Sequence, residues 1–245
     1  MSTRVAVVTG ASSGIGRAVA LSLVADGIEV VGMGRRFSLL EELAQEAEAA
    51  GAAAIRPLEV DLLDEDGVIS AFEQVASFYG GIDIFVANAG TSVGGTIAEG
   101  NAEAWHKVID TNVLVTAVTT REALKLIRNG EGSRHIIFVS SYTARRPRRH
   151  GSKIYAASKA AVLSIADGLR LELHDEDSAI HVTTILPGLV ETPMTEKSIA
   201  GERERGNVFE PLRPEDIAET VRYVVNLPDR VAIDDIVLRP AGQLN

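Results

Sequence analysis

A regular alternation of short apolar segments with longer amphipathic ones constrains the fold most. The short segments are rich in β-branched residues and mostly lack polar/apolar alternation, which is typical of strands buried on both faces. Seven strands are predicted: Arg4–Thr9, Glu29–Met33, Ala54–Val60, Ile82–Val86, His135–Ser140, Ile180–Leu186 and Ile236–Arg239. Six helices are predicted between them: Gly14–Asp26, Ser38–Ala50, Asp64–Tyr79, Asn101–Arg128, Lys153–His174 and Pro214–Asn226. This order predicts an α/β fold, a doubly wound parallel sheet with helices on both faces.

The 245 residues contain no internal repeat, no low-complexity tract and no Pro/Gly linker at which a second domain could begin. An α/β chain of this length can form one domain with a sizeable core, so residues 1–245 are expected to be a single domain. The longest segment without clear periodicity is Thr192–Leu212, which is polar and charged. We expect it to be a mobile flap over the site.

Composition excludes several classes of function. The absence of cysteine excludes disulfide scaffolds, thiolate nucleophiles and zinc sites with sulfur ligands. Asp+Glu outnumber Lys+Arg by 34 to 24, and the resulting charge of -10 is the wrong sign for a general grip on nucleic acid or anionic lipid. The first apolar run, Val5–Val8, is too short for a signal sequence, and no stretch approaches the ~18 apolar residues of a membrane helix. We therefore expect a cytoplasmic protein with no nucleic-acid or membrane partner.

The first predicted strand runs through the turn Thr9–Gly16 directly into a helix. Glycines at positions 10, 14 and 16 would let the backbone approach a pyrophosphate, which the N–H groups and dipole of the helix N-terminus stabilise. The spacing departs from the common G-x-G-x-x-G fingerprint. Two interpretations remain at this point: a dinucleotide site, or a tight turn that needs glycine for its shape alone.

The same turn also fits G-x-S-x-G, the nucleophile elbow of serine hydrolases, with Ser12 as nucleophile. An elbow on the first strand has no earlier strand or loop to supply the second oxyanion N–H. No histidine in the sequence has an evident acidic partner. The hydrolase is retained as an alternative that labelling of Ser12 by a fluorophosphonate would support.

The end of the second predicted strand indicates which dinucleotide is bound. In NAD sites a carboxylate near this point binds the ribose 2′-hydroxyl. Here the segment Gly32–Arg36 contains no carboxylate and ends in Arg35 and Arg36. Guanidinium groups match phosphate oxygens with paired donors, so the two arginines favour NADP(H). The alternative is that they are solvated loop charges.

Tyr155 and Lys159 begin the helix that follows the fifth predicted strand. Residues four apart share a helix face, so both side chains can point into one site. A free phenol has a pKa of about 10, and lowering it by three units needs about 4 kcal/mol of differential stabilisation. We expect a buried lysine together with a cofactor hydroxyl to supply it, making Tyr155 a general acid and base near neutral pH.

These motifs together resemble the short-chain dehydrogenase/reductase family over essentially the whole chain, which implies a single-domain Rossmann fold. The resemblance matches the family's glycine turn to Thr9–Gly16, its adenine-contacting acid to Asp61 with Leu62, its Asn-Ala-Gly to Asn88–Gly90, and its nicotinamide segment to Pro187–Thr192. It implies the catalytic residues Asn112, Ser141, Tyr155 and Lys159. With the two arginines, the expected cofactor contacts are Gly10, Ser12, Ser13, Gly14, Ile15, Gly16, Arg35, Arg36, Asp61, Leu62, Asn88, Ala89, Gly90, Tyr155, Lys159, Pro187, Gly188, Val190 and Thr192.

The resemblance implies transfer of a hydride between NADP(H) and a small alcohol or carbonyl substrate. Ser141 would hold the substrate oxygen, Tyr155 would be the general acid, and Lys159 would lower its pKa and bind the ribose. Asn112 would hold a water linking Lys159 to solvent. The loop from Ser141 to Tyr155 is one residue longer than is usual, so Ser140 remains an alternative for the serine. A cofactor-binding sensor without turnover is the rival function.

The ending Ile236–Gln243 resembles the branch of NADP-dependent 3-hydroxy-acid and serine dehydrogenases and related aldehyde reductases. No metal is expected, because the acids of Asp61–Asp66 lack the spacing of a calcium loop. The histidines also lack paired-ligand spacing: His106, His135, His150, His174 and His181.

Two features allow more than one interpretation. Four arginines between Arg145 and Arg149 either attract an anionic substrate or are loop and subunit contacts. The helices Asn101–Arg128 and Lys153–His174 carry apolar residues on more than one face, which marks a candidate interface. In the resembled family these helices build homodimers and homotetramers.

Overall fold

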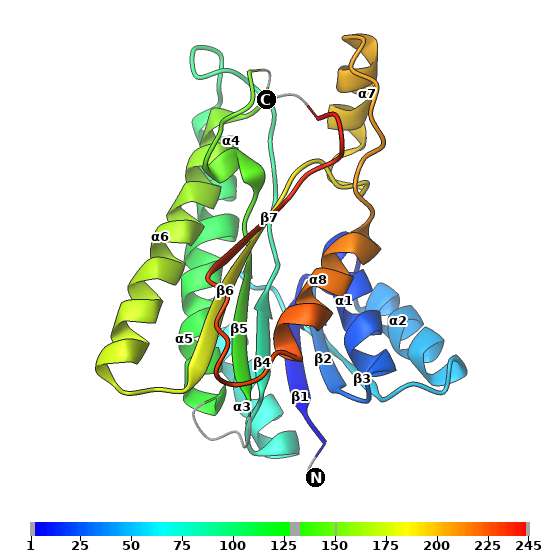
Figure 1. Ribbon diagram of the computed structural model, residues 1–245, viewed down its shortest axis with the longest axis vertical. Coiled ribbons are helices and arrows are strands. Elements are labelled where there is room, and N and C mark those ends of the chain that lie inside the picture. Colours follow the sequence, from blue (N-terminus) through cyan, green and yellow to red (C-terminus); the bar gives the residue numbers. More distant parts are fainter. Residues whose placement is uncertain (1–2, 128–132, 150, 244–245) are drawn as a thin grey trace.

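Parallel strands form one sheet in the computed structural model, which describes residues 3–127, 133–149 and 151–243. The strands are β1 (Val5–Thr9), β2 (Glu29–Gly34), β3 (Ile55–Glu59), β4 (Ile84–Ala87), β5 (Arg134–Val139), β6 (Ile180–Pro187) and β7 (Asp235–Leu238). Their spatial order is β3-β2-β1-β4-β5-β6-β7 (Figure 1). This confirms the predicted single-domain, doubly wound α/β fold of the Rossmann type.

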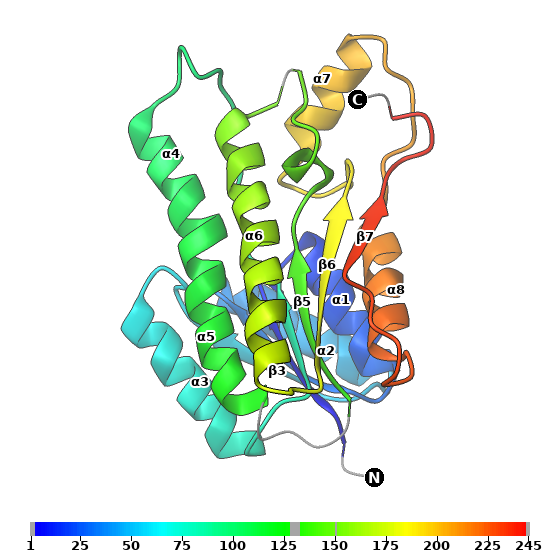
Figure 2. The ribbon, with the colours of Figure 1, turned by 60° about the vertical axis from the view of Figure 1, so that its left-hand side comes forward.

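Helices cover both faces of the sheet. On one face lie α1 (Gly14–Ala25), α2 (Phe37–Ala49) and α8 (Pro214–Val225). On the other lie α3 (Glu65–Tyr79), α5 (Val115–Ile127) and α6 (Lys153–Asp175). The short helices α4 (Ala102–Ile109) and α7 (Glu196–Glu204) lie beyond the carboxyl ends of the strands (Figures 1 and 2).

Strand β1 shows why the strands read as unbroken apolar runs. Ala6 and Val8 belong to the hydrophobic core under α1, α2 and α8, whereas Val5 and Val7 belong to the core under α3, α5 and α6. Successive side chains of a strand point to opposite faces, so a strand between two helical layers needs apolar residues at every position. The two cores together fix the register of the central strands.

The predicted bounds of the strands, and of five of the six helices, are within two residues of those observed. The prediction of one α-helix over Asn101–Arg128 is wrong; Arg128 lies outside the described residues. The segment is α4, a π-helical turn over Asp110–Leu114, and α5, with the Val115 N–H bonded to the Asp110 carbonyl. A π turn inserts one residue into the helical repeat without a change in apolar character, so the sequence does not reveal it.

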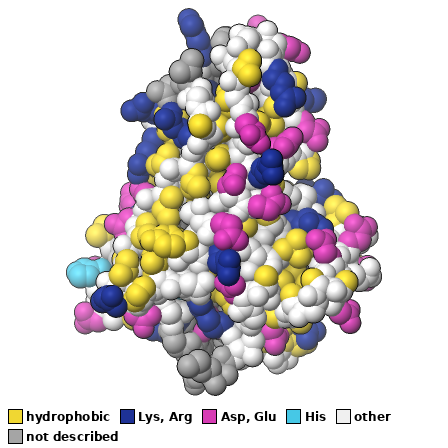
Figure 3. All heavy atoms as spheres, turned by 45° about the vertical axis from the view of Figure 1, so that its right-hand side comes forward, with side chains coloured by type: hydrophobic (Ala, Val, Ile, Leu, Met, Phe, Trp, Pro, Cys, Tyr) yellow, Lys and Arg dark blue, Asp and Glu magenta, His cyan; other side chains and the backbone are white. Residues whose placement is uncertain are grey.

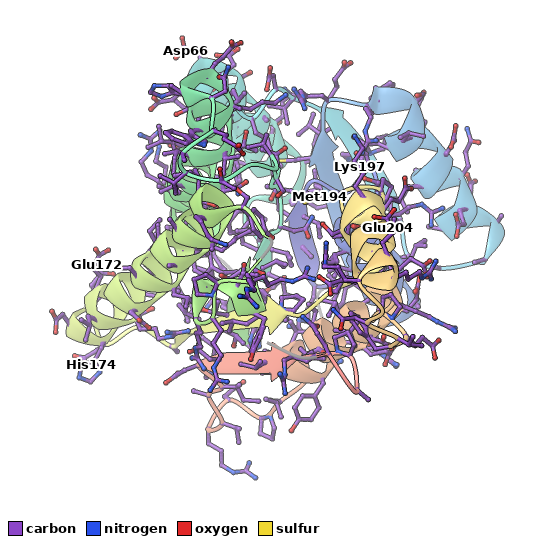
Figure 4. The ribbon with its side chains drawn as sticks, turned by 90° about the horizontal axis from the view of Figure 1, so that it is seen from above. Asp66, Glu172, His174, Met194, Lys197 and Glu204 are labelled. Carbon is purple, nitrogen blue, oxygen red and sulfur yellow. The ribbon has the colours of Figure 1, made fainter. Side chains whose placement is uncertain are left out.

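The segment Thr192–Leu212 contains α7, which was not predicted. Only Ile199 of this helix is buried, so it lacks the apolar stripe that would have indicated a helix. In the view from above, Met194 lies beside α7, toward the middle of the molecule (Figure 4). The expected flap is therefore a segment with a helix of its own, placed beyond the carboxyl ends of the strands.

Candidate active site

The glycine turn and the loop after β4 are joined by Thr9 and Asn88. The Thr9 hydroxyl oxygen accepts hydrogen bonds from the N–H groups of Asn88 and Ala89, at 3.0 and 3.1 Å. In return, Asn88 Nδ2 donates to the Thr9 carbonyl oxygen at 2.9 Å. β1 and β4 are adjacent in the sheet although two strands separate them in the chain. The order of strands in the sheet changes direction between β1 and β4. The loop after β1 and the loop after β4 flank the crevice that this change creates.

The glycines of the turn are required by its geometry. Gly10 and Gly14 have positive φ angles of 68° and 56°. A Cβ atom on Gly16 would lie 2.4 Å from Asn88 Nδ2 and 2.5 Å from the Gly10 carbonyl oxygen, so no side chain fits. The N-cap residue of α1, Ser13, makes no side-chain capping hydrogen bond. The N-terminal N–H groups of α1 therefore face the crevice without a side-chain cap, which suits an anionic group.

Arg36 is positioned by the serines of the same turn. Its Nη2 donates to Ser12 Oγ at 2.8 Å and to Ser13 Oγ at 2.7 Å. Arg35 also lines the crevice, next to Gly34 at the end of β2. The Arg36 guanidinium thus lies beside the glycine turn, and Arg35 lines the same crevice.

Ser141, Tyr155 and Lys159 lie together after the carboxyl end of β5. Ser152 caps α6 by accepting a hydrogen bond from the Tyr155 N–H, which places Tyr155 in the first turn. Lys159, one turn later, is 5% exposed, and its Nζ lies 6.0 Å from the centre of the Tyr155 ring. Nζ donates to the Val139 carbonyl oxygen at 2.8 Å, so the last residue of β5 holds the lysine in place.

The pKa of the Tyr155 phenol is raised by desolvation, partly offset by a side-chain hydrogen bond with Ser141. The expected lowering of this pKa depends on a cofactor hydroxyl as well as on Lys159, so it stays a prediction for the protein with its cofactor bound. Burial lowers the pKa of Lys159 to about 8. A phenol that stays protonated at neutral pH is able to donate a proton to an oxygen placed beside it.

Both candidate serines are buried, but they make different contacts. Ser140 Oγ donates to the Lys159 carbonyl oxygen at 2.8 Å, which ties β5 to α6. Ser141 Oγ accepts from the Thr143 N–H and hydroxyl, at 3.2 and 2.9 Å, and bonds Tyr155. The contacts thus favour Ser141 as the residue that faces a substrate oxygen and Ser140 as a structural residue.

Asn112 lies in the π-helical turn and is completely buried. Its Oδ1 accepts from the Thr91 N–H at 2.7 Å, and its Nδ2 donates to the Thr91 carbonyl and Ser158 Oγ, both at 2.9 Å. A Cβ atom on Gly90 would lie 3.3 Å from Asn112 Oδ1 and 3.4 Å from Lys159 Nζ. Asn112 therefore fixes the loop after β4 against α6, beside the lysine.

Two adjoining cavities occupy the crevice. The large cavity, of about 640 Å³, is lined by all the predicted cofactor and catalytic residues except Gly16 and Asn112, which lie behind its wall. The small cavity, of about 100 Å³, shares part of its wall with the large one, including Ser141 and Tyr155. The sequence motifs are thus brought to one continuous crevice.

Further residues line the large cavity that the sequence analysis did not predict: Gly34, Val60, Leu63, Thr91, Lys107, Thr111, Val115, Val139, Pro193, Met194 and Thr195. Several adjoin predicted positions in the chain. Lys107, Thr111 and Val115 recur at intervals of four, a spacing that marks one helix face and that could have identified them.

Two of the four arginines of the cluster pair with acidic residues. Arg145 pairs with Asp235 of β7, and Arg148 pairs with Glu202 of α7. Arg148 lines the small cavity, whereas Arg145 and Arg146 line neither cavity. These contacts favour the interpretation of the cluster as a structural loop. On the face shown in Figure 3, basic side chains gather along the upper left edge, and acidic and basic side chains are interspersed over the rest.

The contacts of Ser12 do not support the hydrolase alternative. Its hydroxyl accepts from Arg36, while His135 and His181 stack at the amino ends of β5 and β6, the opposite edge of the sheet. His150 lies outside the described residues. Within those residues, no three His, Cys, Asp or Glu side chains are grouped to hold a metal ion. No helix in the described ranges has the length and apolar character needed to cross a membrane.

Comparison with known proteins identifies relatives of the whole chain. Residues 4–203 match the family model described as short chain dehydrogenase. Dehydrogenase/reductase SDR family member 11 from Bos taurus is 39% identical over 248 residues, which cover 98% of this chain and 97% of that protein.

Solved structures agree with this match. An alcohol dehydrogenase from the archaeon Thermococcus sibiricus, complexed with 5-hydroxy-NADP, is 27% identical, with a TM-score of 0.86 over 100% of this chain and 99% of that one. The closed form of serine dehydrogenase complexed with NADP+ is 29% identical, with a TM-score of 0.82 over 96% and 94% of the two chains.

Proposed function

The chain belongs to the short-chain dehydrogenase family, and on this premise we propose that it is an NADP(H)-dependent oxidoreductase that interconverts a small alcohol and its aldehyde or ketone. One observation carries the proposal. Tyr155 and Ser141 line both a cavity of about 640 Å³ walled by the glycine turn and a small cavity of about 100 Å³, and Lys159 lines the larger one beside them. The larger volume suits a dinucleotide and the smaller one a substrate of few atoms.

The choice of NADP(H) rests on the wall beside the glycine turn. The close approach at Gly10 and Gly16 and the uncapped start of α1 fit a pyrophosphate. Arg35 and Arg36 supply guanidinium donors where an NAD site has a carboxylate. The two solved relatives described above are complexes with 5-hydroxy-NADP and NADP+. The other expected cofactor contacts, from Asp61 and Leu62 to Val190 and Thr192, line the same cavity.

When bound, the nicotinamide group would supply or accept the hydride. In the reducing direction, the protonated Tyr155 gives its proton to the substrate carbonyl oxygen, while the Ser141 hydroxyl stabilises charge on that oxygen. Lys159 is held by the Val139 carbonyl and would bind the ribose hydroxyls. Asn112 would order the water that links Lys159 to solvent, from its place behind the Gly90 loop.

Thr192–Leu212 is proposed to be a flap that excludes water from the site. Thr192, Met194 and Thr195 line the large cavity, so the segment already forms part of its wall. The outer faces of α4, α5 and α6 (Figure 2) are proposed to form a homodimer or homotetramer interface, since Ile109 of α4, Leu114 of the π-helical turn and Leu171 of α6 are exposed.

The proposal is tested by titrating NADPH and NADH against the protein and then following nicotinamide oxidation with a panel of small aldehydes, ketones and 3-oxo acids. We expect tighter binding of NADPH and turnover of at least one carbonyl substrate. NADPH binding without any turnover across the panel and in the reverse direction would favour the sensor instead. Failure to bind either dinucleotide would contradict the proposal.

A further inference from the structure

Gln243 closes the small cavity from the tail that follows β7. Its side chain is 6% exposed, and its Oε1 accepts a hydrogen bond from the Leu189 N–H at 3.2 Å. Leu189 follows Gly188, and both residues line the small cavity beside Tyr155. The tail is held to the same segment by the Gly188 N–H, which donates to the Leu238 carbonyl at 2.6 Å.

The hydrogen bond from the Leu189 N–H fixes the orientation of the Gln243 side-chain amide. An N–H donor needs an oxygen acceptor, so Oε1 faces Leu189 and Nε2 is the other end. No described residue accepts a hydrogen bond from Nε2. Nε2 is also not one of the completely enclosed polar atoms that lack a hydrogen-bond partner, so part of its surface is open. Because Gln243 lines the small cavity, we infer that Nε2 keeps its remaining contact with that space.

The amide is held rigidly. A Cβ atom on Gly188 would lie 2.5 Å from Gln243 Oε1 and 2.8 Å from Pro240 Cδ, so the tail packs directly on the glycine backbone. A donor fixed in this way loses little freedom on binding a ligand, which makes it a selective contact rather than an adaptable one.

The rest of the small cavity has both polar and apolar lining residues. Ser92, Thr143 and Ser198 line it together with Leu189 and Met194, and Arg148, which also lines it, is engaged by Glu202. The Gln243 amide is thus a neutral donor for which the described residues supply no acceptor, and Gln243 lines the same small cavity as Tyr155 and Ser141. A ligand that gives this amide no acceptor would leave a buried donor unpaired.

We propose that Gln243 Nε2 is a specificity-determining donor, and that the preferred substrate carries a second oxygen, as a hydroxyl, carbonyl or carboxylate, next to the carbonyl that is reduced. This inference rests on the proposed function and specifies its substrate class. The Tyr155 hydroxyl and Gln243 amide would then hold the two oxygens of one small molecule at once.

A matched pair of ketones tests the inference. Hydroxyacetone and 2-butanone differ by exchange of a hydroxyl for a methyl group next to the reacting carbonyl. We expect kcat/KM for hydroxyacetone to exceed that for 2-butanone by about tenfold or more in the wild type. Equal values, or a preference for 2-butanone, would overturn the inference while leaving carbonyl reduction intact. Absence of turnover with both, despite NADPH binding, would count against the proposed reaction itself and remove the basis of this inference.

One variant separates selection of substrate from support of the fold. Gln243→Glu, assayed at pH 8, keeps an oxygen for the Leu189 N–H but loses the donor. We expect Gln243→Glu to lower kcat/KM for hydroxyacetone by about tenfold while changing that for 2-butanone by less than about threefold. NADPH affinity should stay within about twofold of wild type. Gln74→Glu, the same exchange on an exposed face of α3, is the control and should leave both ketones unchanged. If Gln243→Glu lowered kcat/KM for both ketones by the same factor, the residue would only support the tail.

Discussion

Arg148, in the loop between Ser141 and Tyr155, forms an ion pair with Glu202 of α7. The two side chains are only 19% and 13% exposed, and Glu202 also accepts hydrogen bonds from Arg205 and Asn207. The Arg148 carbonyl in turn accepts from Lys153 Nζ at 2.6 Å, at the first residue of α6. The segment proposed as a flap is thereby tied to the helix that carries Tyr155.

Removing this pair should release α7. In Arg148→Met we expect Glu202 to be left with fewer partners, trypsin to cleave the segment 192–212 several times faster, and KM for the substrate to rise. Breaking a largely buried pair by removing one partner costs on the order of 3 kcal/mol, whereas an exposed pair contributes less than about 1 kcal/mol. Arg145→Met, whose pair with Asp235 is 47% and 25% exposed, is the control. Equal cleavage rates in the two variants would contradict the coupling.

Tyr155→Phe should lower kcat by at least about a hundredfold, because it removes the proton donor and little else. NADPH affinity, measured by fluorescence titration, should change by no more than a few-fold. Tyr223→Phe, at a position 60% exposed on α8, should retain full activity. Turnover above a tenth of the wild-type value in Tyr155→Phe would exclude the residue as general acid.

Lys159 is expected to reduce the stability of the protein when no cofactor is bound. Its pKa is about 8 when folded and 10.5 when exposed, so burying its charge costs about 3 kcal/mol below pH 8. Between pH 8 and 10.5 Lys159 is more fully protonated in the unfolded chain than in the folded one. The contribution of Lys159 to the free energy of unfolding therefore rises with pH over this range.

Lys159→Met should remove that rise and lose the hydrogen bond to Val139. We expect the variant to be more stable than wild type by roughly 2 kcal/mol at pH 7, with the difference shrinking toward pH 10, while kcat and cofactor affinity both fall. Urea unfolding of both proteins at pH 7, 9 and 10 measures this. A less stable variant with an unchanged pH slope would refute the assignment.

Replacing Arg35 and Arg36 together by Ala should weaken NADPH binding by ~2–4 kcal/mol and leave NADH binding nearly unchanged. Arg36 also bonds Ser12 and Ser13, so the melting temperature is measured to detect damage to the turn. Equal losses for the two cofactors would show that these arginines do not recognise the 2′-phosphate.

The sequence predicts the crevice well because its motifs sit at strand ends. Gly10 follows β1 and Asn88 follows β4, and in a doubly wound sheet these ends meet at the point of chain reversal. The effect of desolvation on the Tyr155 pKa was not predictable, since desolvation depends on packing around the residue. Gln243 was not predicted either, because its role depends on a tail packed against Gly188 across the tertiary fold.

The order in which the chain is synthesised has a consequence for the site. Strands β1 to β4, which carry the glycine turn and the Asn88 loop, leave the ribosome early, whereas β7 and Gln243 leave it late. A nascent chain could form much of the dinucleotide crevice before the wall of the small cavity exists. Synthesis that stops short of Gln243, or a protease that trims the tail back past it, would yield a protein that lacks the side chain closing the small cavity.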